Sequence, residues 1–252
     1  MKTLPTIDDC MDVDDILSDA RLDWQPIFDM GDGRMVGGEA LFRSRISPEI
    51  FFSLLDGIGK WEKFTRWQMK MVVDGLSRIP PSGPFLAFVN ISPEQATYAL
   101  TGNWLSRLPE YVTPVIEIVE KELSTIQFQA IFDLKRSGCM IAIDDFGTGR
   151  SNIDRLLAVE ADVVKVDRSL IQVATDDQKD LVRGIIGGMG GKGITILGEG
   201  IERVEHVQFA SEIGCSLGQG WLMGLETGLS EEFYRKKFVP ELPDRTSSFD
   251  LG

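Results

Sequence analysis

The body of this chain alternates short apolar runs with helix-like segments, and this alternation restricts the possible folds more than any other feature. The apolar runs are rich in β-branched and aromatic residues, as strands are, and lie at residues 24–28, 36–42, 85–91, 115–119, 140–143, 163–166, 195–197 and 220–223. Helical periodicity is found at residues 62–77, 125–137, 151–159, 178–188 and 204–213. Repeated strand–helix alternation predicts an α/β fold with a mostly parallel sheet.

A closed (β/α) barrel is the favoured form of this sheet. A chain of 252 residues is long enough to form such a barrel as one large domain. The open doubly wound sheet is less favoured, because no G-x-G-x-x-G motif follows the first apolar run. Residues 29–34, Asp-Met-Gly-Asp-Gly-Arg, predict a hairpin between the first two strands. We expect an acidic N-terminal segment at residues 1–20, compatible with one helix, a barrel at residues 21–240 and a flexible tail at residues 241–252.

Composition limits the partners and the location. Lys and Arg number 26 against 39 Asp and Glu, which gives a net charge of −13. This balance argues against a nucleic-acid polymer as ligand, because polymer binding needs a basic face, but a small phosphate ligand held through metal ions is allowed. Three widely spaced cysteines (Cys10, Cys139 and Cys215), no signal-peptide pattern and no apolar stretch of about 20 residues predict a reduced, cytoplasmic protein without membrane insertion. His206 is the only histidine, which excludes metal sites built on clustered histidines.

Metal-competent side chains stand at the ends of several predicted strands. In residues 140–152 an apolar run ends in the adjacent carboxylates Asp144 and Asp145, and glycines follow. Two like charges side by side repel, so a positive group is expected beside them, most simply a pair of divalent cations. The carboxyl ends of barrel strands share one rim, and this rim brings together five oxygen-bearing side chains: Glu39, Asn90, Glu117, Asp144 and Asp145.

The chemistry of these groups indicates the metal and the reaction class. All-oxygen ligation favours Mg²⁺ or Mn²⁺, and pairs of such cations serve phosphate-ester hydrolysis. A lone acidic residue after a strand is more often a helix cap, so the prediction depends on several of them converging. Further charged residues follow two later strands: Lys165 and Asp167 after one, and Glu199 and Glu202 after the other.

Two other motifs point elsewhere but fail on closer reading. The tripeptide Asp145-Phe-Gly147 matches a protein-kinase metal motif, but the chain lacks the kinase catalytic-loop signature and the Gly-rich strand. Residues 187–193 are glycine-rich like a phosphate-binding loop, but Ile186 and Gly193 occupy the positions where that motif needs Gly and Ser or Thr. We interpret residues 187–193 as a flexible helix end before a strand.

Taken together, the motifs resemble the EAL family of cyclic di-GMP phosphodiesterases, from about residue 22 to residue 224. They occur in the order of the family: Gln25-Pro-Ile27, Glu39-Ala-Leu-Phe-Arg43, Val89-Asn-Ile-Ser92, Glu117-Ile-Val-Glu120, Asp144-Asp-Phe-Gly-Thr-Gly149, Lys165-Val-Asp167, Glu199-Gly-Ile-Glu202 and Gln219-Gly220. The chain departs from the family pattern at Val119, Arg150 and Gly198, and it lacks the Pro/Gly-rich loop expected after Arg43.

The resemblance implies a TIM-like (β/α)8 barrel with an antiparallel first strand, and it implies roles for individual residues. Glu39, Asn90, Glu117, Asp144 and Asp145 match the ligands of two divalent cations. Lys165 matches the lysine that contacts the nucleophilic water, with general base as its proposed role, and Glu199 matches the acidic residue that supports the second cation and its water. Gln25, Leu41, Arg43, Asp167, Glu202 and Gln219 match substrate-binding positions, with Arg43 as a phosphate contact. Glu120, Gly147, Thr148 and Gly149 match the loop that couples the site to a homodimer contact.

The implied reaction is hydrolysis of one 3′–5′ phosphodiester of cyclic di-GMP, a bacterial second messenger, to linear 5′-pGpG by a two-metal mechanism. Lys165 acts as a base only if nearby cations depress its pKa, and otherwise as an electrostatic clamp. Two alternatives stay open. One is a catalytically silent cyclic di-GMP receptor, although the metal-ligand positions are intact. The other is a protein-interaction domain that no longer binds nucleotide, although Arg43, Lys165 and Gln219 are retained.

Overall fold

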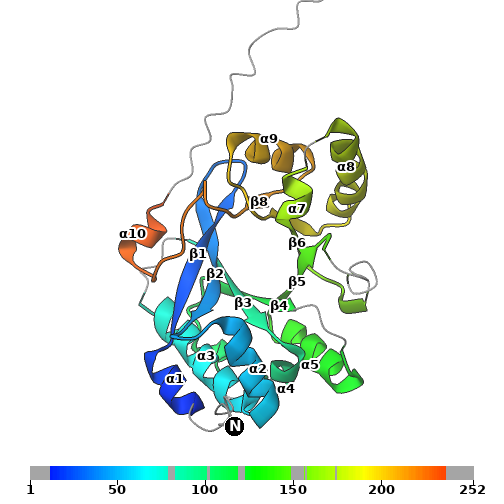
Figure 1. Ribbon diagram of the computed structural model, residues 1–252. Coiled ribbons are helices and arrows are strands. Elements are labelled where there is room, and N and C mark those ends of the chain that lie inside the picture. The colour runs from blue at the N-terminus through cyan, green and yellow to red at the C-terminus, as the bar shows by residue number, and fades with distance from the viewer. Residues whose placement is uncertain are drawn as a thin grey trace, which may run out of the picture.

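The strands form one closed barrel in the order β1 to β8 (Figure 1). The computed structural model describes residues 12–236, except for residues 79–82, 101–102, 119–122, 149–155, 157 and 174. The strand β1 pairs antiparallel with both β2 and β8, and the other neighbours are parallel. The strands are β1 (Arg21–Asp29), β2 (Met35–Arg43), β3 (Phe85–Ile91), β4 (Val112–Ile118), β5 (Met140–Phe146), β6 (Val163–Val166), β7 (Thr195–Gly198) and β8 (Leu217–Gly218). The prediction of a closed barrel with an antiparallel first strand is confirmed.

The predicted hairpin joins β1 and β2. The carboxylate of Asp29 accepts hydrogen bonds from the backbone N–H groups of Gly31 (2.7 Å) and Asp32 (3.1 Å), an arrangement that stabilises a tight turn. Because the hairpin reverses the chain, β2 and the later strands run parallel to one another and their carboxyl ends face the same rim.

Helices surround the barrel, with α2 to α5 on one side and α7 to α9 on the opposite side (Figure 1). They are α1 (Val13–Asp19), α2 (Pro48–Ile58), α3 (Trp61–Leu76), α4 (Pro93–Ala99), α5 (Thr125–Arg136), α7 (Arg168–Ile171), α8 (Asp176–Gly190), α9 (Val204–Glu212) and α10 (Glu231–Tyr234). Most of the helix predicted at residues 151–159 lies outside the described residues; Leu156, Ala158 and Val159 are helical.

The sequence prediction missed α2 and α4, although both carry a clear start signal. Ser47 precedes Pro48 at the first turn of α2, and its side chain accepts a hydrogen bond from the N–H of Ile50. Ser92 precedes Pro93 and forms a capping box with Gln95. A capping serine followed by proline at the first helical position is a strong helix-start pattern, so the start of each helix was readable from the sequence.

The barrel interior and the helix layer form separate apolar clusters. Inward-facing side chains from all but one of the strands fill the barrel below the rim: Ile27, Phe88, Val115, Ala142, Val163, Leu197 and Leu217. An aromatic group packs between β2 and the helices α2 and α3, with Phe42 stacked on Phe51 at 4.7 Å and edge-on to Phe64 at 5.3 Å. The barrel interior is therefore packed with apolar side chains, and polar side chains gather at the carboxyl rim.

The predicted strand at residues 220–223 is wrong. The last strand is β8, only Leu217–Gly218 long, and the chain then turns, with the N–H groups of Met223 and Gly224 donating to the carbonyl of Gly220 at 3.0 and 3.1 Å. Apolar residues after Gly220 suggested a strand, but Trp221 is 71% exposed. In the described part of the chain, no helix combines the length and apolar character that crossing a membrane requires.

Candidate active site

A buried lysine lies at the centre of an acidic cluster at the carboxyl rim. Lys165, on β6, is 1% exposed. Its Nζ lies 3.2 Å from Glu39, 3.0 Å from Glu117, 3.0 Å from Asp144 and 2.9 Å from Glu199. These four carboxylates come from β2, β4, β5 and the residue after β7. The fold thus brings together acids that are up to 160 positions apart in the numbered chain, from Glu39 to Glu199.

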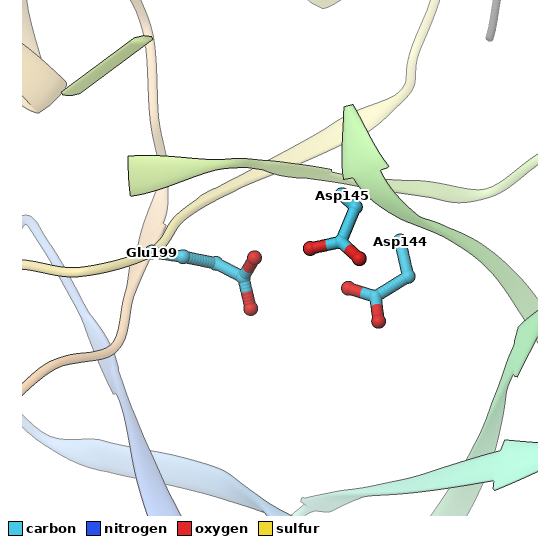
Figure 2. A group of neighbouring side chains, drawn as sticks. All are labelled: Asp144, Asp145 and Glu199. Carbon is cyan, nitrogen blue, oxygen red and sulfur yellow. The ribbon is translucent and has the colours of Figure 1, made fainter. Parts of the chain in front are cut away.

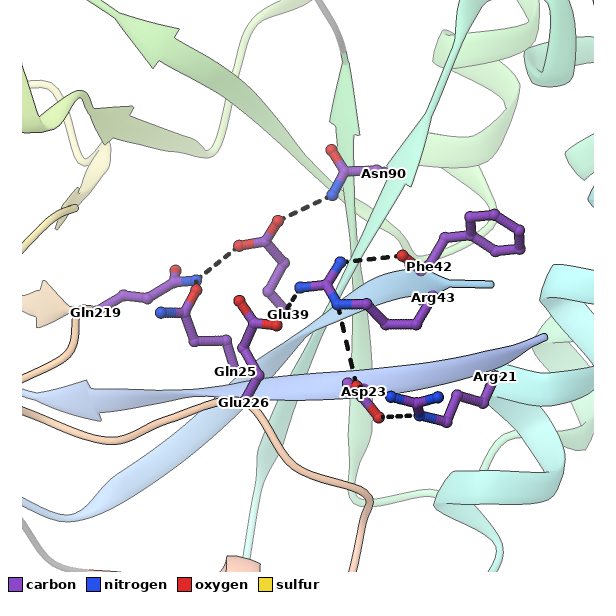
Figure 3. A network of polar contacts seen from close by, with 9 residues as sticks. All are labelled: Arg21, Asp23, Gln25, Glu39, Phe42, Arg43, Asn90, Gln219 and Glu226. Carbon is purple, nitrogen blue, oxygen red and sulfur yellow. Dashed lines mark hydrogen bonds and ion pairs between the residues drawn. The ribbon is translucent and has the colours of Figure 1, made fainter. Parts of the chain in front are cut away.

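Amide side chains hold Glu39 from both sides. The Nδ2 of Asn90 donates to one carboxylate oxygen of Glu39 at 2.9 Å, and the Nε2 of Gln219 donates to the other at 2.7 Å (Figure 3). Gln219 also donates to Gln25 at 2.6 Å. The register explains part of this, because β1 and β2 place Gln25 directly opposite Glu39. The predicted site residues Asn90 and Gln219 thus orient Glu39, and Gln25 in turn accepts a hydrogen bond from Gln219.

Asp144 and Asp145 lie in an irregularity of β5. The register between β5 and β6 shifts between Ile143 and Phe146. Asp145 has φ +53°, a left-handed conformation that is uncommon for non-glycine residues, although Asp adopts it more readily than most. The irregularity lets neighbouring carboxylates, which would alternate on a regular strand, point to a shared space. Carboxylate oxygens of Asp144, Asp145 and Glu199 lie within 4.8 Å of one another (Figure 2).

Burial and mutual repulsion shift the acid–base behaviour of the cluster. Burial, together with the charges of Glu39 and Asp144, raises the pKa of Glu117 well above its ordinary value. Burial raises the pKa of Glu199 to about 7, even though Lys165 opposes the shift. Burial also works against the ionised form of Glu39, but Lys165 and two donated amide hydrogen bonds outweigh it and lower its pKa. For Lys165, burial disfavours the charge, yet the surrounding carboxylates raise its pKa well above the ordinary value.

The cluster fits divalent cations. Lys165 supplies one positive charge to the acids that surround it, and Asp145 adds a further carboxylate beside them. Glu117 is completely buried, and its Oε2 has no hydrogen-bond partner among the described residues. Buried polar atoms normally have partners, and hard cations such as Mg²⁺ and Mn²⁺ take carboxylate and amide oxygens as ligands.

A second network surrounds Arg43, at the end of β2 (Figure 3). Its guanidinium pairs with the carboxylate of Glu226, donates to the carbonyl of Phe42 at 2.9 Å and lies 4.0 Å from Asp23. Asp23 in turn pairs with Arg21 at 3.0 Å. Glu226 was not predicted as a site residue, because no motif or strand-end pattern singles it out.

A cavity of about 350 Å³ opens beside Arg43. Leu41 and Asn90 lie on its wall, and aromatic side chains of α2 and α3 form much of the rest. Trp61 and Phe64 are buried in the core and also line this cavity. The cavity therefore places an apolar, aromatic wall beside the guanidinium of Arg43.

Two glutamines support the cluster from outside it, and the sequence analysis missed both. Gln68, on α3, donates to the backbone carbonyl of Asn90 at 3.0 Å, and Gln95 donates to Gln68 at 2.7 Å. The capping box at Ser92 gives a local reason for Gln95, but nothing local indicates Gln68, because its partner is 22 positions away.

The remaining predicted site residues lie near the rim but outside the cluster around Lys165. Asp167 caps α7, with its carboxylate accepting from the N–H of Ser169 at 2.8 Å. The N–H of Glu202 donates to the Nδ1 of His206 at 3.2 Å. The N–H and hydroxyl of Thr148 both donate to the carbonyl of Asp145, and Gly147 has φ +115°. Glu120 and Gly149 lie outside the described residues.

Comparison with known proteins decides the family. The family model described as EAL domain matches residues 16–225. This chain belongs to the EAL domain family. The matching residues include every strand of the barrel and the whole acidic cluster, and the resemblance inferred from the motifs is confirmed.

Relatives of this EAL domain are mostly longer proteins. It is 27% identical over 212 residues to PdeD of Escherichia coli strain K12, described as a probable cyclic di-GMP phosphodiesterase, covering 79% of this chain and 40% of PdeD. It is 27% identical over 219 residues to RocR of Pseudomonas aeruginosa, described as a cyclic di-GMP phosphodiesterase, covering 79% of this chain and 55% of RocR. The first two curated relatives are matched over 31% and 29% of their length. The chain therefore spans between about a third and a half of such relatives.

Solved structures agree on the fold. The PaMucR phosphodiesterase, described as a c-di-GMP complex, superposes with a TM-score of 0.71 at 26% identity, covering 83% of this chain and 97% of that chain. An EAL domain protein from Listeria monocytogenes superposes with a TM-score of 0.73 at 21% identity, covering 87% and 96%. The barrel fold is thus shared with solved structures of the family.

Proposed function

We propose that this EAL domain hydrolyses cyclic di-GMP to linear 5′-pGpG with two divalent cations, Mg²⁺ or Mn²⁺. The observation that supports this most is the convergence of the predicted metal ligands on one acidic cluster at the carboxyl rim. Membership of the EAL family and relatives described as cyclic di-GMP phosphodiesterases give the substrate.

Glu39, Asn90, Glu117, Asp144 and Asp145 are the proposed cation ligands. When bound, such cations provide a nucleophile at neutral pH and stabilise the charge that develops on the phosphoryl group. The protein's contribution is to fix the ligands before substrate arrives. Amide donors hold both oxygens of Glu39, and strand pairing sets Asn90 beside Glu117.

Lys165 and Glu199 are the proposed catalytic residues. Without cations the carboxylates raise the pKa of Lys165, which supports the role of electrostatic clamp, whereas the role of base requires bound cations to depress that pKa. Glu199, with a pKa of about 7, is poised to accept or release a proton near neutral pH. The Nζ of Lys165 lies 2.9 Å from the carboxylate of Glu199, so the protonation state of either residue changes the electrostatic energy of the other.

Substrate contacts are proposed along the rim. Arg43 offers a guanidinium to a phosphodiester anion. Leu41 lines the cavity beside Arg43, and Gln25 and Gln219 are hydrogen-bonded to each other beside Glu39. Asp167 and Glu202 are further proposed contacts. The cavity beside Arg43 has aromatic walls that suit a flat, partly apolar group.

Purified protein incubated with cyclic di-GMP tests the proposal. Linear dinucleotide is expected with Mg²⁺ or Mn²⁺ and none in EDTA. Asp144→Asn is expected to remove turnover, whereas Asp133→Asn, which changes an acid on the outer helix α5, is expected to leave it unchanged. No product with either metal overturns the hydrolase, and calorimetry on the same sample then separates a silent receptor, which binds cyclic di-GMP, from a domain that does not.

We further propose a cytoplasmic location and a homodimer coupled to the site through the loop after β5. Part of that loop, including Gly149, lies outside the described residues. Light scattering over a range of protein concentrations checks the dimer. A monomer at all concentrations in the presence of cation and substrate contradicts it.

A further inference from the structure

Arg43 is already paired with an anion of its own chain. Its Nη2 pairs with the carboxylate of Glu226, which is 183 positions away. The two side chains are 31% and 34% exposed, so the pair is accessible to solvent and to a ligand. Figure 3 shows the Glu226 carboxylate on the side of Arg43 that faces Gln25 and Glu39.

The backbone holds Glu226 in this place. The next residue, Thr227, forms an isolated bridge with Trp24 of β1, with hydrogen bonds of 2.7 and 3.0 Å. Two residues before Glu226, Gly224 has φ +158°, and a Cβ there would meet the ring of Pro26 at 2.7 Å. The segment therefore lies tightly against β1 on both sides of Glu226, and its carboxylate is presented to Arg43 by fixed backbone.

The position that Glu226 takes is one where an anionic substrate group would bind. Arg43 stands on the same strand as Glu39, four residues further toward the rim, so the two side chains point to the same face of β2. A guanidinium binds carboxylates and phosphodiesters with the same donors. Asp23, at 4.0 Å from Arg43, already shares its charge with Arg21 and competes less.

We propose that Glu226 limits the affinity of Arg43 for anionic ligands: its carboxylate occupies the anion position of Arg43, and a phosphodiester ligand must displace it to bind. This inference rests on the proposed function for the identity of the ligand. Because the Glu226 carboxylate is part of the chain, it is present at high local concentration and weakens the binding of every ligand that contacts Arg43. For a ligand that also contacts the acidic cluster, Glu226 weakens binding but does not change the rate of the chemical step, since Glu226 does not contact the described members of that cluster.

The test separates binding from turnover. Glu226→Gln keeps the shape and removes the charge, and it is expected to lower the KM for cyclic di-GMP by about two- to fivefold, the range that a partly exposed ion pair supports, with kcat unchanged. Glu212→Gln is the matched control, because Glu212 also pairs with an arginine of another element, Arg183, at 2.8 Å but lies on the outer helix α9. An unchanged or higher KM in Glu226→Gln, or a fall in kcat alone, overturns the proposal.

A second readout does not need catalysis. The ¹⁵Nε–¹Hε resonance of Arg43, assigned with Arg43→Lys, is followed during titration with dimethyl phosphate, a simple phosphodiester, in EDTA. Glu226→Gln is expected to shift this resonance before any ligand is added and to lower the apparent Kd for dimethyl phosphate by a similar factor. A resonance that is the same in both proteins overturns the inference, whether or not the protein hydrolyses cyclic di-GMP.

Discussion

At the scale of single residues, Lys165 has two distinct roles, one proposed in catalysis and one in stability. It is a proposed catalytic group, and it is also the counter-ion of four carboxylates within 3.2 Å. A buried acid without a compensating charge is strongly destabilising. The structural duty therefore exists even when no substrate is present, and it can be measured apart from activity.

We predict that Lys165→Met lowers the free energy of unfolding in EDTA by about 3 to 5 kcal/mol, because it leaves buried carboxylates without their partner. Urea unfolding measures the change. Adding Mn²⁺ is expected to restore much of the loss, since cations replace the missing charge. Lys179→Met is the control, because Lys179 lies on α8, 3.9 Å from a 98% exposed Asp176, and is expected to change stability by less than about 0.5 kcal/mol. Equal urea midpoints for the two variants contradict the assignment.

His206 is a second residue whose protonation is tied to the fold. It is buried, its Nδ1 accepts from the N–H of Glu202 at 3.2 Å, and the guanidinium of Arg203 lies 3.0 Å from its Nε2. Burial, followed by the charge of Arg203, lowers the pKa of His206 below its ordinary value of 6.5. The folded state therefore favours the neutral ring, which ties the segment after β7 to the start of α9.

This depressed pKa adds one pH-dependent contribution to stability. The contribution of His206 is complete above pH 6.5 and is lost as the pH falls through the lower, folded-state pKa, because the unfolded chain binds the proton more readily. We predict that unfolding free energies of the parent protein fall more steeply below about pH 6.5 than those of His206→Asn, whose amide oxygen keeps an acceptor near the Nδ1 position. Parallel pH profiles from urea unfolding would show that His206 does not titrate with folding.

At the scale of elements, the sequence predicted strands well where burial on both faces makes them continuous apolar runs. The run at residues 140–143 is β5, and the structure extends it through Asp144 and Asp145 to Phe146. The extension was not predictable from pattern, because β5 ends in an irregular register with β6. At the last strand the pattern misled, since the close approach of Gly218 and Gly220 to neighbouring chain, not apolar character, decides where β8 ends.

The candidate site was also predictable only in part from the sequence. Which acids meet was predictable, because parallel strands deliver their carboxyl ends to one rim. How they meet was not, because it depends on side chains that cross the barrel. The central place of Lys165 and the pairing of Arg43 with Glu226 both join residues more than 100 positions apart, and no local spacing encodes either contact.

The turn after β8 gives an element-scale prediction. Gly220 has φ +157°, and a Cβ there would meet the backbone nitrogen of Ile201 at 2.3 Å. We predict that Gly220→Ala lowers the free energy of unfolding by at least about 2 kcal/mol, since backbone must move, and displaces the neighbouring Gln219. Gly184→Ala is the control, because a Cβ on this α8 glycine has nothing within 4 Å and alanine is the better helix former by about 1 kcal/mol. Thermal unfolding is expected to shift in opposite directions, and shifts of the same sign contradict the argument.

At the scale of the whole molecule, the acidic cluster connects much of the barrel. Its members come from β2, β4, β5, β6 and the residue after β7, so charged groups from opposite sides of the barrel interact at the carboxyl rim. The chain as a whole is also acidic, with a net charge of −13, which adds a general repulsion that salt screens. Any ion that binds the cluster specifically therefore stabilises most of the barrel at once.

The last prediction follows from this coupling. At about 100 times its dissociation constant, Mn²⁺ is expected to raise the free energy of unfolding by about 2.7 kcal/mol, which corresponds to about 5 to 10 °C in Tm for a domain of this size, and the transition is expected to stay single. NaCl at matched ionic strength is the control, because it screens the net charge without entering the cluster. In Glu117→Gln the Mn²⁺-specific part of the shift is expected to shrink, while the protein in EDTA becomes more stable, because burial and the neighbouring acids raise the pKa of Glu117 and disfavour its charge. If NaCl and Mn²⁺ shift the Tm equally, the cations act only on the overall charge and the cluster is not their site.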